Sequence, residues 1–193
     1  TSSYRENGTL NTEMLIGKYF KLSQLIHSNT AKNKGGSNIP GQDAKKKPQW
    51  TEEYIIRNLE NLMINVGDYI IAKYPNMKIT SGYRAKKLND SLGSNDNSHH
   101  PQGCALDIQV PGGTTAEITN FIVDNIPAYA QVIWEKPESG GSWVHIAYKD
   151  GDTRKKTDVY TSKENILTHY GNKRRGGGTT KYMAIDRAKQ NLV

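Results

Sequence analysis

The chain has 193 residues, a length that suits one domain with a core large enough to fold without disulfides. Its single cysteine, Cys104, excludes an intrachain disulfide, and the absence of an apolar run of about 18 residues excludes a transmembrane helix. The formal net charge of +7 favours a partner with an acidic surface, and the N-terminus shows no signal-peptide pattern.

The first part of the chain is expected to hold one strong helix. Residues 1–17 are polar and weakly patterned, with a short helix expected around residues 10–16. Ser23 can cap a second short helix. Residues 28–49 are rich in glycine and lysine and are predicted to form a long surface loop. A helix over 51–74 follows, because apolar residues recur there at helical spacing and acidic residues occupy its first turn.

Shorter elements follow, in an irregular order of strands and helices. The expected strands are 77–80, 104–110, 130–135 and 142–149, and the expected helices are 85–92 and 114–126. Since strands and helices do not alternate regularly, we expect an α+β fold with a central antiparallel sheet and flanking helices. The tail from residue 161 holds the basic cluster Lys173–Arg175, the glycines 176–178 and a short helix expected around 183–190.

Strand alternation places ionisable side chains on one face of this sheet. In 104–110 the even-numbered residues are apolar, so Asp107 points to the opposite, polar face. If the three strands are neighbours, His145 and Glu135 project to the same side, with His100 arching over them from the preceding loop. Two histidines and one carboxylate form a common zinc set that leaves a position for water. Each residue alone has a simpler explanation, as a surface histidine or as an aspartate that caps a turn.

The spacing of these residues resembles a known family. The segment from Ser98 to Asp107 matches the pattern S-x-H-x-x-G-x-A-x-D and resembles the zinc D-Ala-D-Ala carboxypeptidase-like (M15) peptidases, especially their phage-type subgroup. An upstream S-G-Y-R at 81–84 and the segments 132–135 and 143–146 also resemble that family, and the resemblance covers roughly residues 18–156.

The resemblance implies a hedgehog/DD-peptidase fold and one zinc ion held by His100, Asp107 and His145. It also implies that Arg84 steadies the substrate carbonyl or carboxylate as charge develops there. Ser98 and Gln102 belong to the same loop, and we expect them on the substrate side of the site.

The general base is where this sequence departs from the family pattern. Many members carry an acidic residue three positions before the last histidine, and here that position is Ser142. We expect Glu135 to serve as the base, because a carboxylate there can take a proton from the attacking water. Its simpler role is to orient a ligand histidine, and His99 is a further candidate acid.

These features predict three segments: an N-terminal extension (1–17), a zinc peptidase domain (18–160) and a basic C-terminal extension (161–193). The expected activity is hydrolysis of amide bonds in peptidoglycan stem peptides, either D-Ala-D-Ala or an L-Ala-D-Glu-type bond. By analogy with phage-type members, we expect a lysin or a tail-associated cell-wall hydrolase, located in the virion or released from or within the host bacterium.

Two other functions compete with this expectation. A virion structural module on the same fold would bind zinc without appreciable turnover. A combination of the two is an active peptidase carried on a phage tail, with residues 1–17 and 161–193 as attachment segments to other virion proteins. Nucleic-acid binding ranks lower, because the basic residues are spread along the chain and no nucleic-acid motif is present.

Overall fold

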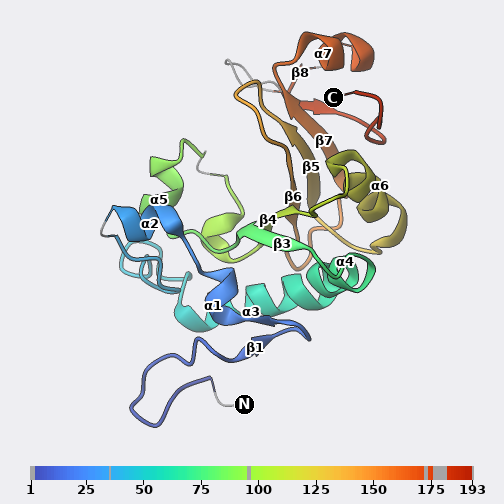
Figure 1. The fold of residues 1–193 in the computed structure, drawn as a ribbon. Coiled ribbons are helices and arrows are strands. Elements are labelled where there is room, and N and C mark those ends of the chain that lie inside the picture. Colours follow the sequence, from blue (N-terminus) through green and yellow to red (C-terminus); the bar gives the residue numbers. More distant parts are fainter. Residues whose placement is uncertain (1–2, 35, 95–96, 172–173, 176–181, 193) are drawn as a thin grey trace.

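The centre of the molecule is a mixed sheet with the strand order β3-β4-β6-β5-β7-β9-β8 (Figure 1). The computed structural model describes residues 3–34, 36–94, 97–171, 174–175 and 182–192. The strands of the sheet are β3 (Lys78–Ser81), β4 (Ala105–Gln109), β5 (Gln131–Lys136), β6 (Trp143–Ala147), β7 (Lys156–Thr161), β8 (Arg174–Arg175) and β9 (Tyr182–Ala184). The expected α+β class is confirmed.

Most of the helices surround this sheet. They are α1 (Leu22–Leu25), α2 (Asn29–Asn33), α3 (Glu52–Leu62), α4 (Asp68–Lys73), α5 (Lys86–Ser91), α6 (Thr115–Asn125) and α7 (Glu164–Tyr170). The helix expected over 51–74 is observed as α3 and α4, joined by the π-helical turn Met63–Gly67. Its start is confirmed, because the Thr51 side chain accepts a hydrogen bond from the Tyr54 backbone. None of the described helices is long and apolar enough to cross a membrane.

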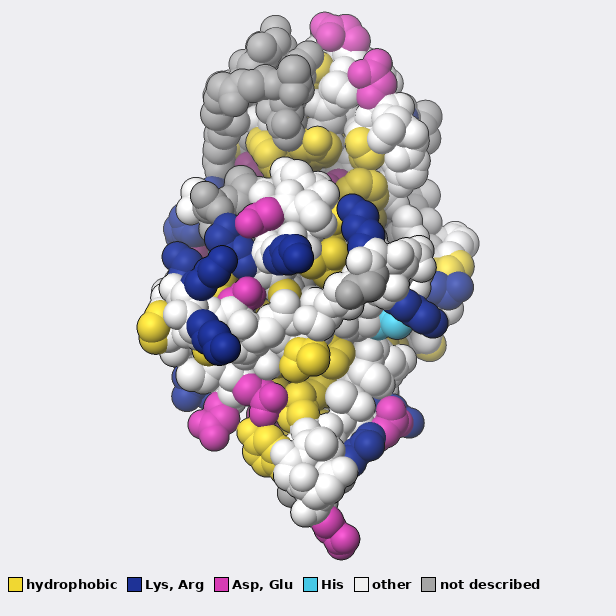
Figure 2. Space-filling view, turned by 90° about the vertical axis from the view of Figure 1, so that its left-hand side faces the viewer, with side chains coloured by type: hydrophobic (Ala, Val, Ile, Leu, Met, Phe, Trp, Pro, Cys, Tyr) yellow, Lys and Arg dark blue, Asp and Glu magenta, His cyan; other side chains and the backbone are white. Residues whose placement is uncertain are grey.

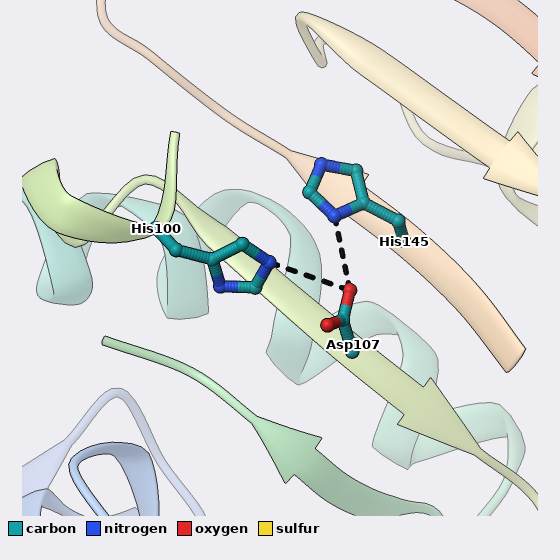
Figure 3. A group of neighbouring side chains, drawn as sticks. All are labelled: His100, Asp107 and His145. Atoms are coloured by element: carbon teal, nitrogen blue, oxygen red, sulfur yellow. Dashed lines mark hydrogen bonds and ion pairs between the residues drawn. The ribbon is translucent and has the colours of Figure 1, made fainter. Parts of the chain in front are cut away.

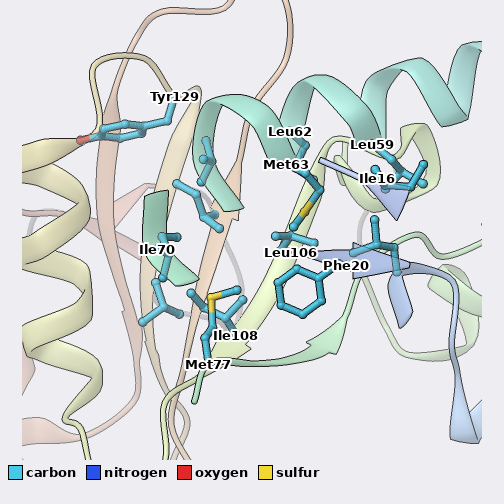
Figure 4. Close-up of a cluster of buried hydrophobic side chains, with 14 of the residues drawn as sticks. Ile16, Phe20, Leu59, Leu62, Met63, Ile70, Met77, Leu106, Ile108 and Tyr129 are labelled. Atoms are coloured by element: carbon cyan, nitrogen blue, oxygen red, sulfur yellow. The ribbon is translucent and has the colours of Figure 1, made fainter. Parts of the chain in front are cut away.

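One face of the sheet carries the main core (Figure 4). Leu59, Leu62 and Ile70 from the α3–α4 segment pack with Leu106 and Ile108 of β4, and all five are buried. The apolar stripe of the helices and the even-numbered residues of β4 therefore form one interior, as their periodicities predict. The opposite face of the sheet stays open for polar side chains.

The sheet differs from the antiparallel expectation at one pair of strands. β5 pairs antiparallel with β6 but parallel with β7. β6 already has β4 on its other side, so the chain leaves β6, reverses, and adds β7 to the free edge of β5. A strand that reverses after β6 must run in the direction of β5, which explains the parallel pair.

Both ends of the chain also differ from expectation. Residues 10–16 do not form a helix: β1 (Leu15–Ile16) pairs with β2 (Phe20–Lys21) in a two-stranded sheet. The loop expected over 28–49 contains α2, whose first turn is capped by the Ser28 side chain.

The helix predicted around 183–190 is wrong, because Tyr182–Ala184 forms β9. Met183 is fully buried and packs in a second core cluster with Trp134 and Val159, so tertiary packing overrides the local preference. The glycines 176–178 lie outside the described residues.

Candidate metal centre

Three side chains from different elements meet above the open face of the sheet (Figure 3). Asp107 of β4 lies directly opposite His145 of β6 in the antiparallel register, and His100 begins the short turn η2 (His100–Gln102). The Asp107 Oδ1 atom is 3.0 Å from His145 Nδ1 and 3.4 Å from His100 Nε2. One nitrogen or oxygen atom from each of the three residues lies within 4.8 Å of the other two.

The tautomer of His100 is fixed by the backbone. His100 Nδ1 lies 2.6 Å from the Gly82 carbonyl oxygen, so this nitrogen carries the proton and donates it. Nε2 of the neutral ring then presents a lone pair toward the carboxylate of Asp107. Among the described residues this buried Nε2 has no hydrogen-bond partner. A zinc ion would accept this lone pair and contact the carboxylate, so the arrangement suits a metal.

The pKa shifts of His100 and Asp107 give these two side chains the protonation states that metal ligands require. Burial is the main cause that lowers the pKa of His100, so the ring stays neutral. Burial alone would raise the pKa of Asp107, but the adjacent imidazoles of His100 and His145 outweigh it and hold that pKa far below its ordinary value. A neutral His100 imidazole beside an ionised Asp107 carboxylate matches the donor state of zinc ligands. The residues present therefore fit a zinc ion.

The three residues lie in a cleft of about 1050 Å³. Arg84 lines it, with Nη2 3.8 Å from Asp107 Oδ2, and its buried Nε has no hydrogen-bond partner among the described residues. Glu135 lines it as well: β5 places Ile133 opposite His145, and Glu135 follows two residues along on the same face. Burial is the main cause that raises the pKa of Glu135, to about 7.

The other predicted site residues divide into two groups. Ser98 lines the cleft and accepts a hydrogen bond from the His100 backbone, and His99 lines it with a pKa that burial chiefly lowers, to about 4. Gln102 is not part of the described lining, because its Oε1 accepts hydrogen bonds from Tyr54 and Lys149. The roles of these residues stay predictions.

Ser142, where the family resemblance leads us to expect an acidic residue, is engaged elsewhere. Its Oγ lies 2.6 Å from Thr115 Oγ1 and donates to the Glu135 carbonyl oxygen at 2.9 Å. The serine thus ties α6 to the end of β5, and its hydroxyl is not directed into the cleft.

The sequence reasoning missed one wall of the cleft. β7 and β9 contribute Lys156, Asp158, Tyr160 and Tyr182 to its lining. The sequence shows that Lys156, Asp158 and Tyr160 share one face of a strand, but it does not show where that strand lies in the sheet.

Comparison with known proteins identifies the region that holds this constellation. A family model described as Peptidase M15 matches residues 18–147, a span that contains the three candidate ligands together with Arg84 and Glu135. No curated protein matches the chain.

Proposed function

The chain belongs to the peptidase M15 family, and from this premise we propose that it is a zinc metallopeptidase that hydrolyses amide bonds in peptidoglycan stem peptides. The observation that carries the proposal is the lone pair of His100 Nε2 directed at the ionised Asp107, with His145 beside them. A bound zinc ion would lower the pKa of a water molecule and polarise the scissile carbonyl. The protein's own residues would supply binding, orientation and proton transfer.

Glu135 is the proposed general base. It accepts a proton from the attacking water as the water oxygen bonds to the carbonyl carbon, and it returns a proton to the nitrogen as the carbon–nitrogen bond breaks. Its raised pKa favours this exchange near neutral pH. A divalent cation in the same cleft would favour the ionised form and so lower that pKa.

Arg84 is the proposed electrophilic partner. Its side chain is mostly buried beside Asp107, which fixes the guanidinium at one side of the cleft. A fixed cation stabilises charge that develops on the carbonyl oxygen without reorganisation of solvent. Ser98 would bind substrate from the neighbouring loop, where its hydroxyl also holds the His100 backbone.

We place the enzyme in a phage setting, as a lysin or a tail-associated cell-wall hydrolase. The support is the resemblance of the sequence to phage-type peptidases. Residues 1–17 and 161–193 lie outside the matched span and would attach the domain to other virion proteins. Ile16 and Met183 are fully buried, so only the outward surfaces of these segments could take that role.

The test combines metal content with digestion of purified peptidoglycan. Wild type should bind one zinc ion and release new amino groups. Glu135→Gln should keep the metal and lose at least about 100-fold in activity, the range of general acid–base catalysis. His145→Ala should lose both metal and activity. Glu138→Gln is the matched control, because the Glu138 carboxylate accepts a hydrogen bond from Ser162 and does not line the cleft.

Two outcomes would change the proposal. Zinc binding with no cleavage of any wall peptide would favour the structural module over the enzyme. Full activity of Glu135→Gln would assign the base to another residue, with His99 the next candidate in the lining. Analysis of the released products, as free D-alanine or as new peptide N-termini, would identify the bond that is cut.

A further inference from the structure

The far wall of the cleft comes from strands beyond the matched family span. That span ends at residue 147, the last residue of β6, whereas Lys156, Tyr160 and Tyr182 come from β7 and β9. The catalytic half of the cleft is therefore shared with the family, and the other half depends on the C-terminal strands of this chain. A wall of this kind is suited to recognising a part of the substrate remote from the reacting bond.

The register gives the position of this wall. His145 of β6 lies opposite Ile133 of β5, which lies opposite Asp158 of β7. Neighbouring strands are about 4.8 Å apart, so β7 runs about 10 Å from His145. Lys156 precedes Asp158 by two residues and shares its face. An extended peptide advances about 3.3 Å per residue, so a substrate residue near β7 lies about three residues from the metal ligands.

Among the described residues, Lys156 differs from the other cations of the cleft because it has no ion-pair partner. Arg84 is close to Asp107, and Arg154 makes two charge-assisted hydrogen bonds to Asp152. No carboxylate of the described residues forms an ion pair with Lys156. The carboxylate of Asp158, on the same face, accepts a hydrogen bond from Gln131.

Two aromatic side chains lie further along the same wall, at the other end of β7 from Lys156. The rings of Tyr160 and Tyr182 lie with their centroids 4.9 Å apart, and Tyr160 faces Glu135 across the β5–β7 pair. Aromatic rings offer rigid apolar contact at low entropic cost. The wall thus offers, at separate points, a cation without an ion-pair partner among the described residues and an aromatic surface, which suit a carboxylate and an apolar part of the same peptide.

The basic character of the molecule supports an acidic ligand. The net charge is +7, and Lys and Arg side chains gather across the middle of the face shown in Figure 2. Within the lining, the cations Arg84, Arg154 and Lys156 balance the anions Asp107, Glu135 and Asp158. A bound divalent cation would leave the cleft with an excess of positive charge.

We propose that Lys156 forms a subsite that binds a carboxylate-bearing residue of the peptide substrate, about three residues from the bond that is cut, while the Tyr160–Tyr182 pair contacts another part of the same peptide. The proposal rests on the proposed function for the identity of the reaction and adds a specificity determinant to it. Lys156 binds and positions the substrate and takes no part in the chemistry.

The test uses a matched pair of soluble stem peptides, one with free side carboxylates and one with carboxamides, and the same C-terminus on both. Zinc-loaded wild type should show a KM about 3- to 10-fold lower for the acid peptide, the range of a partly exposed charge pair. Lys156→Met should lose that preference by weakening only the acid peptide, with kcat unchanged. Lys156→Arg should retain it. Lys87→Met, at an exposed position outside the lining, is the control for net charge.

The outcomes separate this proposal from the proposed function. If wild type cleaves both peptides and Lys156→Met keeps the full preference, the subsite is overturned and the peptidase stands. If wild type cleaves neither peptide, the proposed function fails, and calorimetric binding of the two peptides decides the subsite. Tighter binding of the acid peptide to wild type, lost in Lys156→Met, would support the subsite. Equal binding of both peptides to wild type would overturn the subsite.

Discussion

Gly82 should control the affinity of the metal centre although it is not a ligand. Its carbonyl oxygen lies 2.6 Å from His100 Nδ1 and accepts the hydrogen bond that fixes the tautomer of this ring. A Cβ atom on this residue would clash with the Leu25 carbonyl oxygen and lie 3.1 Å from the carbonyl carbon, whereas ordinary contacts begin at 3.4 Å. Gly82→Ala must therefore shift the backbone by at least 0.3 Å at the carbonyl carbon, and by more at the oxygen.

Two effects follow from that shift. Overpacking should reduce the free energy of unfolding by about 1–3 kcal/mol. Displacement of the group that orients a ligand histidine should weaken zinc binding about 10- to 100-fold, equivalent to about 1.4–2.7 kcal/mol.

The assay is zinc affinity by chelator competition, with thermal unfolding of the metal-free protein measured in parallel. Gly36→Ala is the control, because its added Cβ would find its nearest neighbour at 3.6 Å. Zinc affinity of Gly82→Ala within twofold of wild type, together with a lowered Tm, would refute the link between this carbonyl and the metal.

Three further predictions concern stability and reactivity. The pKa of Glu135 is raised from 4.5 to about 7, so in metal-free protein its contribution to stability should be complete below about pH 4.5 and lost as the pH rises through about 7. The difference in urea-unfolding free energy between wild type and Glu135→Gln should change over that window by about 3 kcal/mol, and a pH-independent difference would contradict the assigned cause. Met183→Ala should cost about 2–5 kcal/mol because the side chain is fully buried against Trp134, whereas Ile64→Ala, at a half-exposed position, should cost less than about 1 kcal/mol by the same denaturant titration. Cys104 is buried with a pKa that burial chiefly raises, to about 12, so iodoacetamide should label it only in denaturant, and rapid labelling of native protein would disprove this environment.

The site was predictable from sequence where local rules govern it. Alternation along a strand fixes which side chains share a face, so Asp107, His145 and Glu135 could be placed together once the strands were taken as neighbours. The position of His100 depended on the motif, because a residue in a loop has no periodicity to locate it. The Gly82 carbonyl that orients it is a backbone group, and no side-chain pattern signals its role.

The parts that escaped prediction depend on long-range contacts. The segment around Met183 reads locally as a helix, yet it forms β9 because Met183 and Ile185 can bury against Trp134 there. In the same way, the parallel placement of β7 follows from which edge of the sheet is free, a property of the assembled strands and not of the β7 sequence. Its contribution to the cleft was hidden for that reason.

The parallel strand β7 also has a consequence for how this protein can be shortened. A fragment that stops at residue 147, the end of the family match, would leave β5 as the last strand of the sheet. Its unpaired backbone groups would border the apolar run Val132–Trp134, and an exposed edge of this kind is a template for strand addition by other copies. We therefore expect such a fragment to self-associate, and attempts to isolate a minimal peptidase should keep the chain through β9.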